Sequence, residues 1–205
     1  MKAGAEKKDM LAPERELHGE GFSLVCGVDE AGRGPLAGPV CAAAVIFPRD
    51  LVLPGVDDSK KLTPAKREEL FDLIIGSAVT YGIGWADEKE IDEINILRAT
   101  MAAMNRAIAR LDPPPELALI DGNRNKGILT PSRCLVGGDA KSQSIAAASI
   151  LAKVSRDRRM LELDELYPEY GFAAHKGYGT AAHYAALRQY GPSPVHRMTF
   201  LRKMH

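Results

Sequence analysis

The sequence predicts an α/β fold in which helices cover a mixed sheet. Short apolar runs bounded by turn residues alternate with longer segments of helical periodicity, after an initial part that is rich in strands. The 205 residues match the usual size of one domain, and 45% hydrophobic with 26% charged residues is a composition typical of globular chains. No run of about 18 apolar residues occurs in the sequence, so we expect no membrane-spanning helix.

Short apolar segments are predicted to be strands. Each is bounded by turn residues such as glycine, proline or aspartate, as expected for strands that are buried in a sheet. The third candidate contains two glycines, which weaken its strand propensity. The candidates are residues 23–29 (SLVCGVD), 40–47 (VCAAAVIF), 79–85 (VTYGIGW), 116–121 (ELALID) and 133–136 (RCLV).

Segments with helical periodicity lie between and after these strands. Thr63 followed by Pro64 is a typical helix start, with a capping hydroxyl and proline at the first helical position. Thr180 has the same capping role before the last helix. The predicted helices cover residues 64–76, most of 94–111, 142–166 and 181–190. Residues 1–22 are largely polar with no sustained period, so we expect a flexible N-terminal leader before a single domain at 23–205.

Charge and cysteine content narrow the possible functions. The formal net charge is zero, but residues 1–125 carry a net −6 and residues 126–205 a net +6. A basic face would attract a polyanion, although a dipolar surface without a binding role is an equal alternative. Cys26, Cys41 and Cys134 form no CxxC pair, which disfavours a zinc site and indicates a reducing compartment. With no secretory signal visible at the N-terminus, we expect a cytoplasmic protein.

Acidic residues end two of the predicted strands. Asp29 and Glu30 end the first strand, and Asp121 ends the LALID segment. If these strands are neighbours, Asp29 and Asp121 face one another across a gap of about 5 Å. A carboxylate at the end of a buried strand carries a desolvation cost unless a cation or a donor offsets it. An aspartate that only makes a turn is the alternative, and two adjacent acids disfavour it.

The acids predict a site for hard metal ions. Oxygen ligands favour Mg²⁺ or Mn²⁺ over zinc. Asp139, in GGDAKS just before the long helix, is either the N-terminal cap of that helix or a fourth ligand. Four such carboxylates suit two divalent ions, which activate a water and stabilise the leaving oxygen in phosphodiester cleavage. The sequence therefore suggests a nuclease.

Glycine-rich segments supply candidate contacts to a nucleic acid. Gly32, Arg33 and Gly34 follow the first acids and offer backbone N–H groups and a guanidinium to a phosphate. In HKGYGT, Tyr178 lies between glycines, where its ring can stack on a sugar or base and its hydroxyl can meet a 2′-OH. A turn tyrosine packed on the core is the alternative. His175, His183 and His196 show no metal-ligand pattern and are expected to be surface or packing residues.

Other nucleotide-binding motifs fit poorly. The glycines after the first strand are spaced as GxGxxxG and are followed by prolines, which oppose the helix that a dinucleotide-binding loop requires. No GxxxxGK[ST] motif occurs. A dinucleotide-dependent oxidoreductase is therefore a weak alternative.

Six segments, in this order, resemble bacterial type 2 ribonuclease H (RNase HII): GVDEAGRGPLAGPV, DDSKKLT, LIDGN, GGDAKSQSIAAASILAKVSRD, HKGYGT and HRMTF. They extend over residues 25–200, nearly the whole chain. The resemblance implies a ribonuclease H-like fold, with a five-stranded mixed sheet flanked by helices and a small helical C-terminal part at about 167–205. Type 3 ribonuclease H is disfavoured, because that type carries an additional N-terminal domain and only about 22 residues precede the first strand here.

The resemblance also implies an activity and its site residues. The activity is an endonuclease that cuts RNA in RNA/DNA hybrids and cuts 5′ of single ribonucleotides embedded in duplex DNA, leaving a 3′-hydroxyl and a 5′-phosphate, as ribonucleotide excision repair requires. The family's metal-binding carboxylates fall on Asp29, Glu30, Asp121 and Asp139, and not on Asp157. Its 2′-OH-sensing element falls on Gly32, Arg33 and Gly34, and its stacking tyrosine on Tyr178.

The same resemblance defines the expected cofactors and partners. We expect Mn²⁺ or Mg²⁺ in a two-metal site, a monomer, and RNA/DNA hybrids or ribonucleotide-containing duplex DNA as substrates, with no membrane partner. No glutamine-led sliding-clamp motif ends the sequence. A non-catalytic nucleic-acid-binding module is the main alternative, which the four acids disfavour because uncompensated negative charge weakens binding to phosphates.

Overall fold

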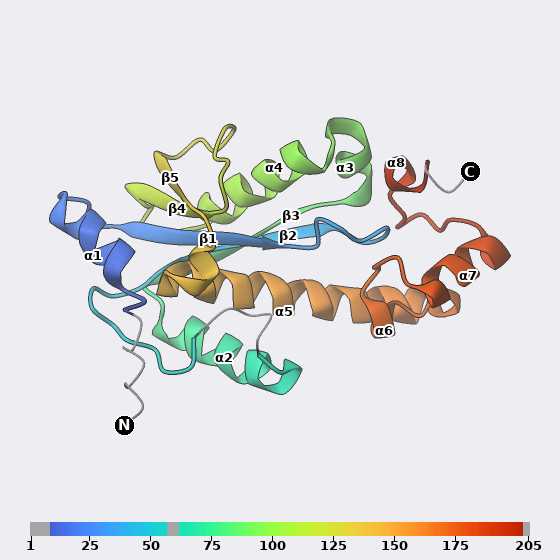
Figure 1. Cartoon of the computed structure of the whole chain (residues 1–205), viewed down its shortest axis with the longest axis horizontal. Helices are drawn as coiled ribbons and strands as arrows, with labels where there is room; N and C mark the ends of the chain where they lie inside the picture. The colour runs from blue at the N-terminus through green and yellow to red at the C-terminus, as the bar shows by residue number, and fades with distance from the viewer. Residues whose placement is uncertain (1–8, 57–61, 203–205) are drawn as a thin grey trace, which may run out of the picture.

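The computed structural model describes residues 9–56 and 62–202. A five-stranded mixed sheet is covered by helices on both faces (Figure 1), which confirms the predicted fold class. The strand order is β3-β2-β1-β4-β5; β1 is antiparallel to β2 and parallel to β4, β2 is antiparallel to β3, and β4 is parallel to β5. The strands are β1 (Val25–Ala31), β2 (Val40–Ile46), β3 (Thr80–Ala86), β4 (Leu117–Asp121) and β5 (Ser132–Leu135). Each overlaps a strand predicted from the sequence.

Both faces of the central strands are buried under helices. In β2, Ala42 and Ala44 pack in the cluster that includes α4 (Ile96–Ile108), while the intervening residues pack in the cluster that includes α2 (Pro64–Ser77) and α5 (Gln143–Leu166). A strand covered on both faces is apolar at successive positions, and for this reason VCAAAVI is a continuous apolar run.

Glycines let two helices approach the sheet closely. A Cβ at Gly27 of β1 would lie 2.2 Å from the backbone of Ser144 in α5, and a Cβ at Gly84 of β3 would lie 2.1 Å from the carbonyl oxygen of Ala103 in α4. The glycines that weaken the strand propensity of β3 are therefore required by the packing of the helix above it.

Part of the expected leader is helical. Ala12–Gly19 forms α1, in which Leu17 and Glu14 are buried. Glu14 Oε1 accepts hydrogen bonds from the hydroxyls of Ser142 and Ser144 and from the Ser144 N–H at the start of α5. The prediction of a flexible segment is therefore wrong for Ala12–Gly19. The sequence did not reveal this helix, because one buried carboxylate and a few apolar contacts hold it and these produce no periodic apolar pattern. Residues 1–8 lie outside the described residues.

The helix predicted over most of 94–111 is present as α4, which begins at Ile96. Asn95 has a φ of 69° and separates α3 (Glu88–Ile94) from α4, and its side chain accepts hydrogen bonds from the first N–H groups of α4. Asparagine tolerates this left-handed conformation better than most residues and is a strong N-cap. The overlooked signal for α3 is Asp87, which caps that helix three residues before Glu90.

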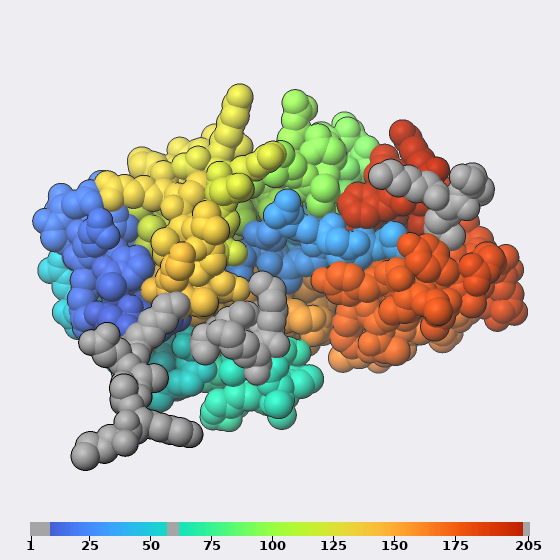
Figure 2. Space-filling view, in the orientation of Figure 1, coloured from blue at the N-terminus to red at the C-terminus, as the bar shows by residue number. Residues whose placement is uncertain are grey.

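The chain after α5 forms short helices at one end of the sheet. They enclose their own apolar cluster, which includes Phe172, Leu187 and Leu36 of the β1–β2 loop. Figures 1 and 2 show this part, in orange and red, at the end of the molecule opposite α1, in blue. Its elements are η3 (Pro168–Tyr170), α6 (Phe172–His175), α7 (Ala181–Tyr190) and α8 (Met198–Leu201). Within the described residues, no helix combines the length and the apolarity that a membrane crossing needs.

Candidate active site

The two acid-bearing strands are neighbours. β1 and β4 run parallel, with Val28 paired to Ile120 at the end of the ladder. The next residues of the two strands are Asp29 and Asp121, which therefore leave the same edge of the sheet side by side. This confirms the expected adjacency of the strands.

Asp29 is in an environment that opposes its negative charge. The residue is 5% exposed, and one carboxylate oxygen accepts a hydrogen bond of 2.7 Å from the Glu30 N–H. Burial first, and then the charges of Glu30 and Asp121, raise the pKa of Asp29 well above its ordinary value, against hydrogen bonds that include one from Ser149 of α5. A cation among these carboxylates would relieve the repulsion.

Asp121 organises the turn that carries Asp139. Its Oδ1 accepts a hydrogen bond of 2.7 Å from the N–H of Gly138, the first residue of η2 (Gly138–Ala140). Asp139 is the next residue and is buried. The alternative that Asp139 caps α5 is wrong, because Ser142 has this role and accepts a hydrogen bond from the Ile145 N–H.

The glycine-rich β1–β2 loop is held by the buried Arg197. Its guanidinium donates to the carbonyl oxygens of Gly32, Arg33 and Gly38 at 2.6–3.0 Å. Because C=O and N–H point in opposite directions across a trans peptide, the N–H groups of Arg33 and Gly34 point away from Arg197. Burial is the main cause that lowers the pKa of Arg197 to about 9, still well above neutrality.

A second buried arginine, Arg156 of α5, connects the loop to the C-terminal part. It donates to the carbonyl oxygens of Ala37 and Pro39 in the loop and of Lys176 before α7. Gly32 lies directly against Arg156, since a Cβ at Gly32 would be 1.9 Å from Arg156 Nε. The φ of Gly32 is 94°. Sequence reasoning did not identify either arginine, because each one contacts carbonyls more than 100 residues away in the chain.

The acids, the loop and the tyrosine surround one cleft of about 270 Å³. Asp139 does not line it; this residue follows Gly138 in η2, whose N–H donates to Asp121. Sequence reasoning missed Ser149, Lys153 and Arg156, all from α5. The predicted site residues that line the cleft are Asp29, Glu30, Gly32, Arg33, Gly34, Asp121 and Tyr178.

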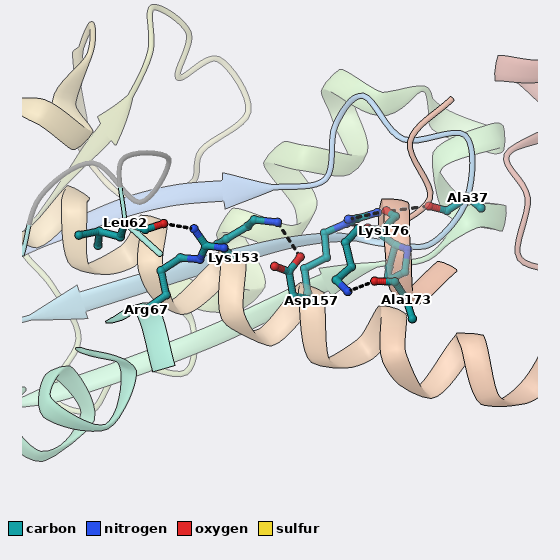
Figure 3. A network of polar contacts seen from close by, with 9 residues as sticks. Ala37, Leu62, Arg67, Lys153, Asp157, Ala173 and Lys176 are labelled. Carbon is teal, nitrogen blue, oxygen red and sulfur yellow. Dashed lines mark hydrogen bonds and ion pairs between the residues drawn. The ribbon is translucent and has the colours of Figure 1, made fainter. Parts of the chain in front are cut away.

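Two cations of the cleft are paired with acids. Arg33, whose side chain is about half exposed, contacts Glu30 at 3.2 Å, so a phosphate would compete with Glu30 for this guanidinium. Lys153 pairs with Asp157 at 2.6 Å along one face of α5 (Figure 3). Asp157 therefore pairs with a lysine, which agrees with its exclusion from the four predicted metal-binding carboxylates.

A chain of hydrogen bonds between histidines supports Tyr178. The Ser193 N–H donates to His196 Nδ1 at 2.9 Å, His196 Nε2 lies 3.0 Å from His183 Nε2, and His183 Nδ1 lies 2.9 Å from the Tyr178 carbonyl oxygen. These partners fit two neutral rings, in which His196 donates to His183 and His183 donates to the carbonyl. Both rings are buried, which confirms that they are packing residues.

We expect the free energy of unfolding to decrease as pH falls from about 6.5 toward 4. Burial first, and then the nearby His183, lower the pKa of His196 to about 4. Between these pH values the unfolded chain binds more protons than the folded one, so stability rises with pH. Urea unfolding at several pH values should show a shallower dependence in His196→Gln, by about 2 kcal/mol between pH 7 and 5. His18→Gln, far from this cluster, is the control, and an unchanged dependence in His196→Gln would contradict the prediction.

Comparisons with known proteins identify the family. Residues 26–203 match the model of the Ribonuclease HII family. Ribonuclease HII of Geobacter sulfurreducens is 59% identical over 180 residues, which cover 88% of this chain and 83% of that protein. The crystal structure of ribonuclease H2 from Pyrococcus horikoshii OT3 superposes with a TM-score of 0.71 at 31% identity, over 85% of this chain and 92% of that one. Bst-RNase HIII in complex with Mn²⁺ shares the fold alone, with a TM-score of 0.67 at 19% identity over 93% and 69% of the two chains. The cleft at the ends of β1 and β4 thus lies in an endonuclease of the ribonuclease H class, and the chain belongs to the ribonuclease HII family.

Proposed function

We propose that this protein cuts the RNA strand of RNA/DNA hybrids and cuts 5′ of single ribonucleotides in duplex DNA, at the cleft described above. The observation that carries the proposal is the convergence of two kinds of group in that cleft. Asp29, Glu30 and Asp121 supply acids for phosphodiester chemistry, while the Gly32–Gly34 segment and Tyr178 supply contacts to a nucleotide. Such a combination fits an enzyme better than a binding module, because clustered carboxylates repel phosphates unless cations are bound.

The acids fit divalent metal ions by their chemistry. All are oxygen donors, and the pKa of Asp29 is raised first by burial and then by the charges of Glu30 and Asp121, both of which a bound cation would offset. Among the described residues, no three acidic, histidine or cysteine side chains are close enough together to hold a metal ion, so the fit rests on the chemistry of the donor set. We propose Asp29, Glu30, Asp121 and Asp139 as the ligands of Mg²⁺ or Mn²⁺ in a two-metal site. Bound there, the ions would activate a water and stabilise the leaving 3′-oxygen.

The chain's own residues would position the scissile phosphate. The Arg33 and Gly34 N–H groups, oriented by Arg197, can donate to the ribonucleotide or its phosphate. Tyr178 is 47% exposed, and a Cβ at Gly34 would lie 3.6 Å from its ring, so tyrosine and loop approach the same nucleotide from two sides. The products would carry a 3′-hydroxyl and a 5′-phosphate. We also propose a cytoplasmic location, supported by the three free cysteines, and a monomer, as the family resemblance implies.

Cleavage mapping tests this proposal. A labelled DNA duplex with one ribonucleotide, an RNA/DNA hybrid and an all-DNA duplex are incubated with Mg²⁺, Mn²⁺ or EDTA, and the products are mapped to the nucleotide. We expect cutting only with metal, only in the first two duplexes, and on the 5′ side of the single ribonucleotide. Tight binding without cutting by either metal would favour a non-catalytic module.

Tyr178→Ala should reduce cleavage at a single ribonucleotide more than it reduces duplex affinity. The ring would orient one sugar beside the scissile phosphate, whereas most of the duplex affinity comes from phosphate contacts along its length. We expect a loss of roughly tenfold or more in kcat/KM, with a change of less than about threefold in Kd for the duplex. Tyr190→Ala, which removes an exposed tyrosine from the end of α7, is the matched control. Equal losses in cleavage and affinity would argue against the assignment.

A further inference from the structure

A second groove leaves the active-site cleft on the side of α4. One part of it, about 380 Å³, is lined by Glu30, Arg33 and Asp121 together with Asn123 and Arg124. A larger part of about 810 Å³ continues over α4 and shares Asn123 and Arg124 with the first. The groove is therefore continuous with the proposed catalytic acids.

The walls of the larger part are basic. Arg98 comes from α4, and Arg124 and Lys126 come from the β4–β5 loop; all three side chains are exposed. Within the described residues, none of the three has a carboxylate within ion-pair distance, and no residue lining this part is acidic. In a chain whose formal net charge is zero, three unpaired cations around one groove are a local concentration of positive charge.

Two asparagines fix the shape of the groove. The Asn105 side chain on α4 donates to the Gly127 carbonyl oxygen and accepts a hydrogen bond from the Leu129 N–H, which holds the β4–β5 loop against the helix. Asn125 donates to the carbonyl and hydroxyl oxygens of Ser132 at the start of β5. Figure 2 shows the yellow-green loop region and the green helix region along the same edge of the molecule, above the blue β1–β2 segment. Arg124 and Lys126 are thus carried by a loop whose conformation is set before a ligand arrives, and Arg98 is carried by a helix.

We infer that this groove binds the sugar-phosphate backbone of the duplex on one side of the cleavage site, through Arg98, Arg124 and Lys126. The inference rests on the proposed function, since it assigns the groove to the same substrate. Charge complementarity and continuity with the cleft identify the occupant: a polyanion that enters the active site can extend past Arg124, which lines both parts of the groove, to Arg98 and Lys126. The floor residues Leu97, Met101 and Ala102 offer apolar contact to sugars.

The test compares wild type with Arg98→Gln, Arg124→Gln, Lys126→Gln and the triple variant. Arg110→Gln is the control, because Arg110 is an exposed arginine on the segment after α4 that contacts the Ile83 carbonyl oxygen, away from the groove. Binding to a fluorescent duplex with one ribonucleotide is measured in EDTA over a range of salt concentrations, and cleavage is measured separately with metal. The flanks are about 12 base pairs, or roughly 40 Å, on both sides, and are then trimmed to about 4 base pairs on one side at a time.

On the long duplex, we expect Kd to rise about threefold to tenfold in each single variant and the salt slope to fall by about one per lost phosphate contact. The Arg110→Gln control should match wild type in Kd, in salt slope and in cleavage. Trimming the flank that occupies the groove should abolish the difference between wild type and the triple variant, while trimming the other flank should preserve it.

Unchanged affinity and salt slope in the triple variant would overturn the inference and leave the groove for another occupant, such as an acidic peptide. A loss of duplex affinity in the triple variant that persists whichever flank is trimmed would also overturn the inference. Failure of the proposed function looks different, because wild type would then cut no substrate even if the groove variants weakened duplex binding.

Discussion

Asp29→Asn is expected to abolish cleavage while the protein keeps its fold. The substitution removes the carboxylate at the centre of the acid cluster and retains a side chain of nearly the same size. Loss of this proposed metal ligand should cost at least about 4 kcal/mol of transition-state stabilisation, or roughly a thousandfold in single-turnover rate. The free energy of unfolding of the metal-free protein should not fall, because burial and the charges of Glu30 and Asp121 oppose ionisation of Asp29.

Single-turnover cleavage of the ribonucleotide-containing duplex and urea unfolding in EDTA check both parts of this prediction. Asp157→Asn is the matched control: Asp157 is the acid of the SRD segment, and it pairs with Lys153 instead of joining the carboxylate cluster. It should retain most of the activity. Normal turnover by Asp29→Asn, or equal inactivation by the two variants, would contradict the site.

Gly32→Ala should impair both stability and cleavage far more than Gly21→Ala. Both glycines have positive φ values, 94° and 105°, so alanine strains the backbone by about 1–2 kcal/mol at either position. The surroundings differ, because a Cβ at Gly32 would overlap the guanidinium of Arg156, whereas nothing lies within 4 Å of a Cβ at Gly21.

The overlap at Gly32 should add about 1–3 kcal/mol of destabilisation and displace the loop from its bonds to Arg197. Because the loop carries the proposed 2′-OH contacts, kcat/KM at a single ribonucleotide should fall by at least tenfold, beyond any fall in Gly21→Ala. Urea unfolding and steady-state kinetics on both variants measure this difference. Similar losses in the two variants would show that only the backbone conformation matters at Gly32.

The sequence predicted the features that depend on local pattern. The continuous apolar run of β2 and the capping residues Thr63 and Thr180 are local signals, and the elements that they predicted are present. Acids at strand ends predicted a site at that edge of the sheet, and β1 and β4 bring Asp29 and Asp121 there.

Features that depend on distant contacts were not predictable in this way. Helix α1 has little apolar periodicity and depends on Glu14, whose partners Ser142 and Ser144 lie more than 120 residues later. The Arg197 guanidinium reaches carbonyl groups 159–165 residues earlier in the chain. An isolated arginine in HRMTF has no pattern that distinguishes a buried hydrogen-bond donor from a surface cation.

The close contact between Gly27 and Ser144 has a consequence for the motions of the enzyme. With no space between the β1 and α5 backbones, α5 cannot slide along the sheet, and Ser149 keeps its place beside Asp29. Amide hydrogens of β1 and α5 should therefore exchange with deuterated solvent only through global opening, whereas those of the short C-terminal helices can exchange through local opening. The proposed catalytic acids would then stay stationary relative to α5 between turnovers.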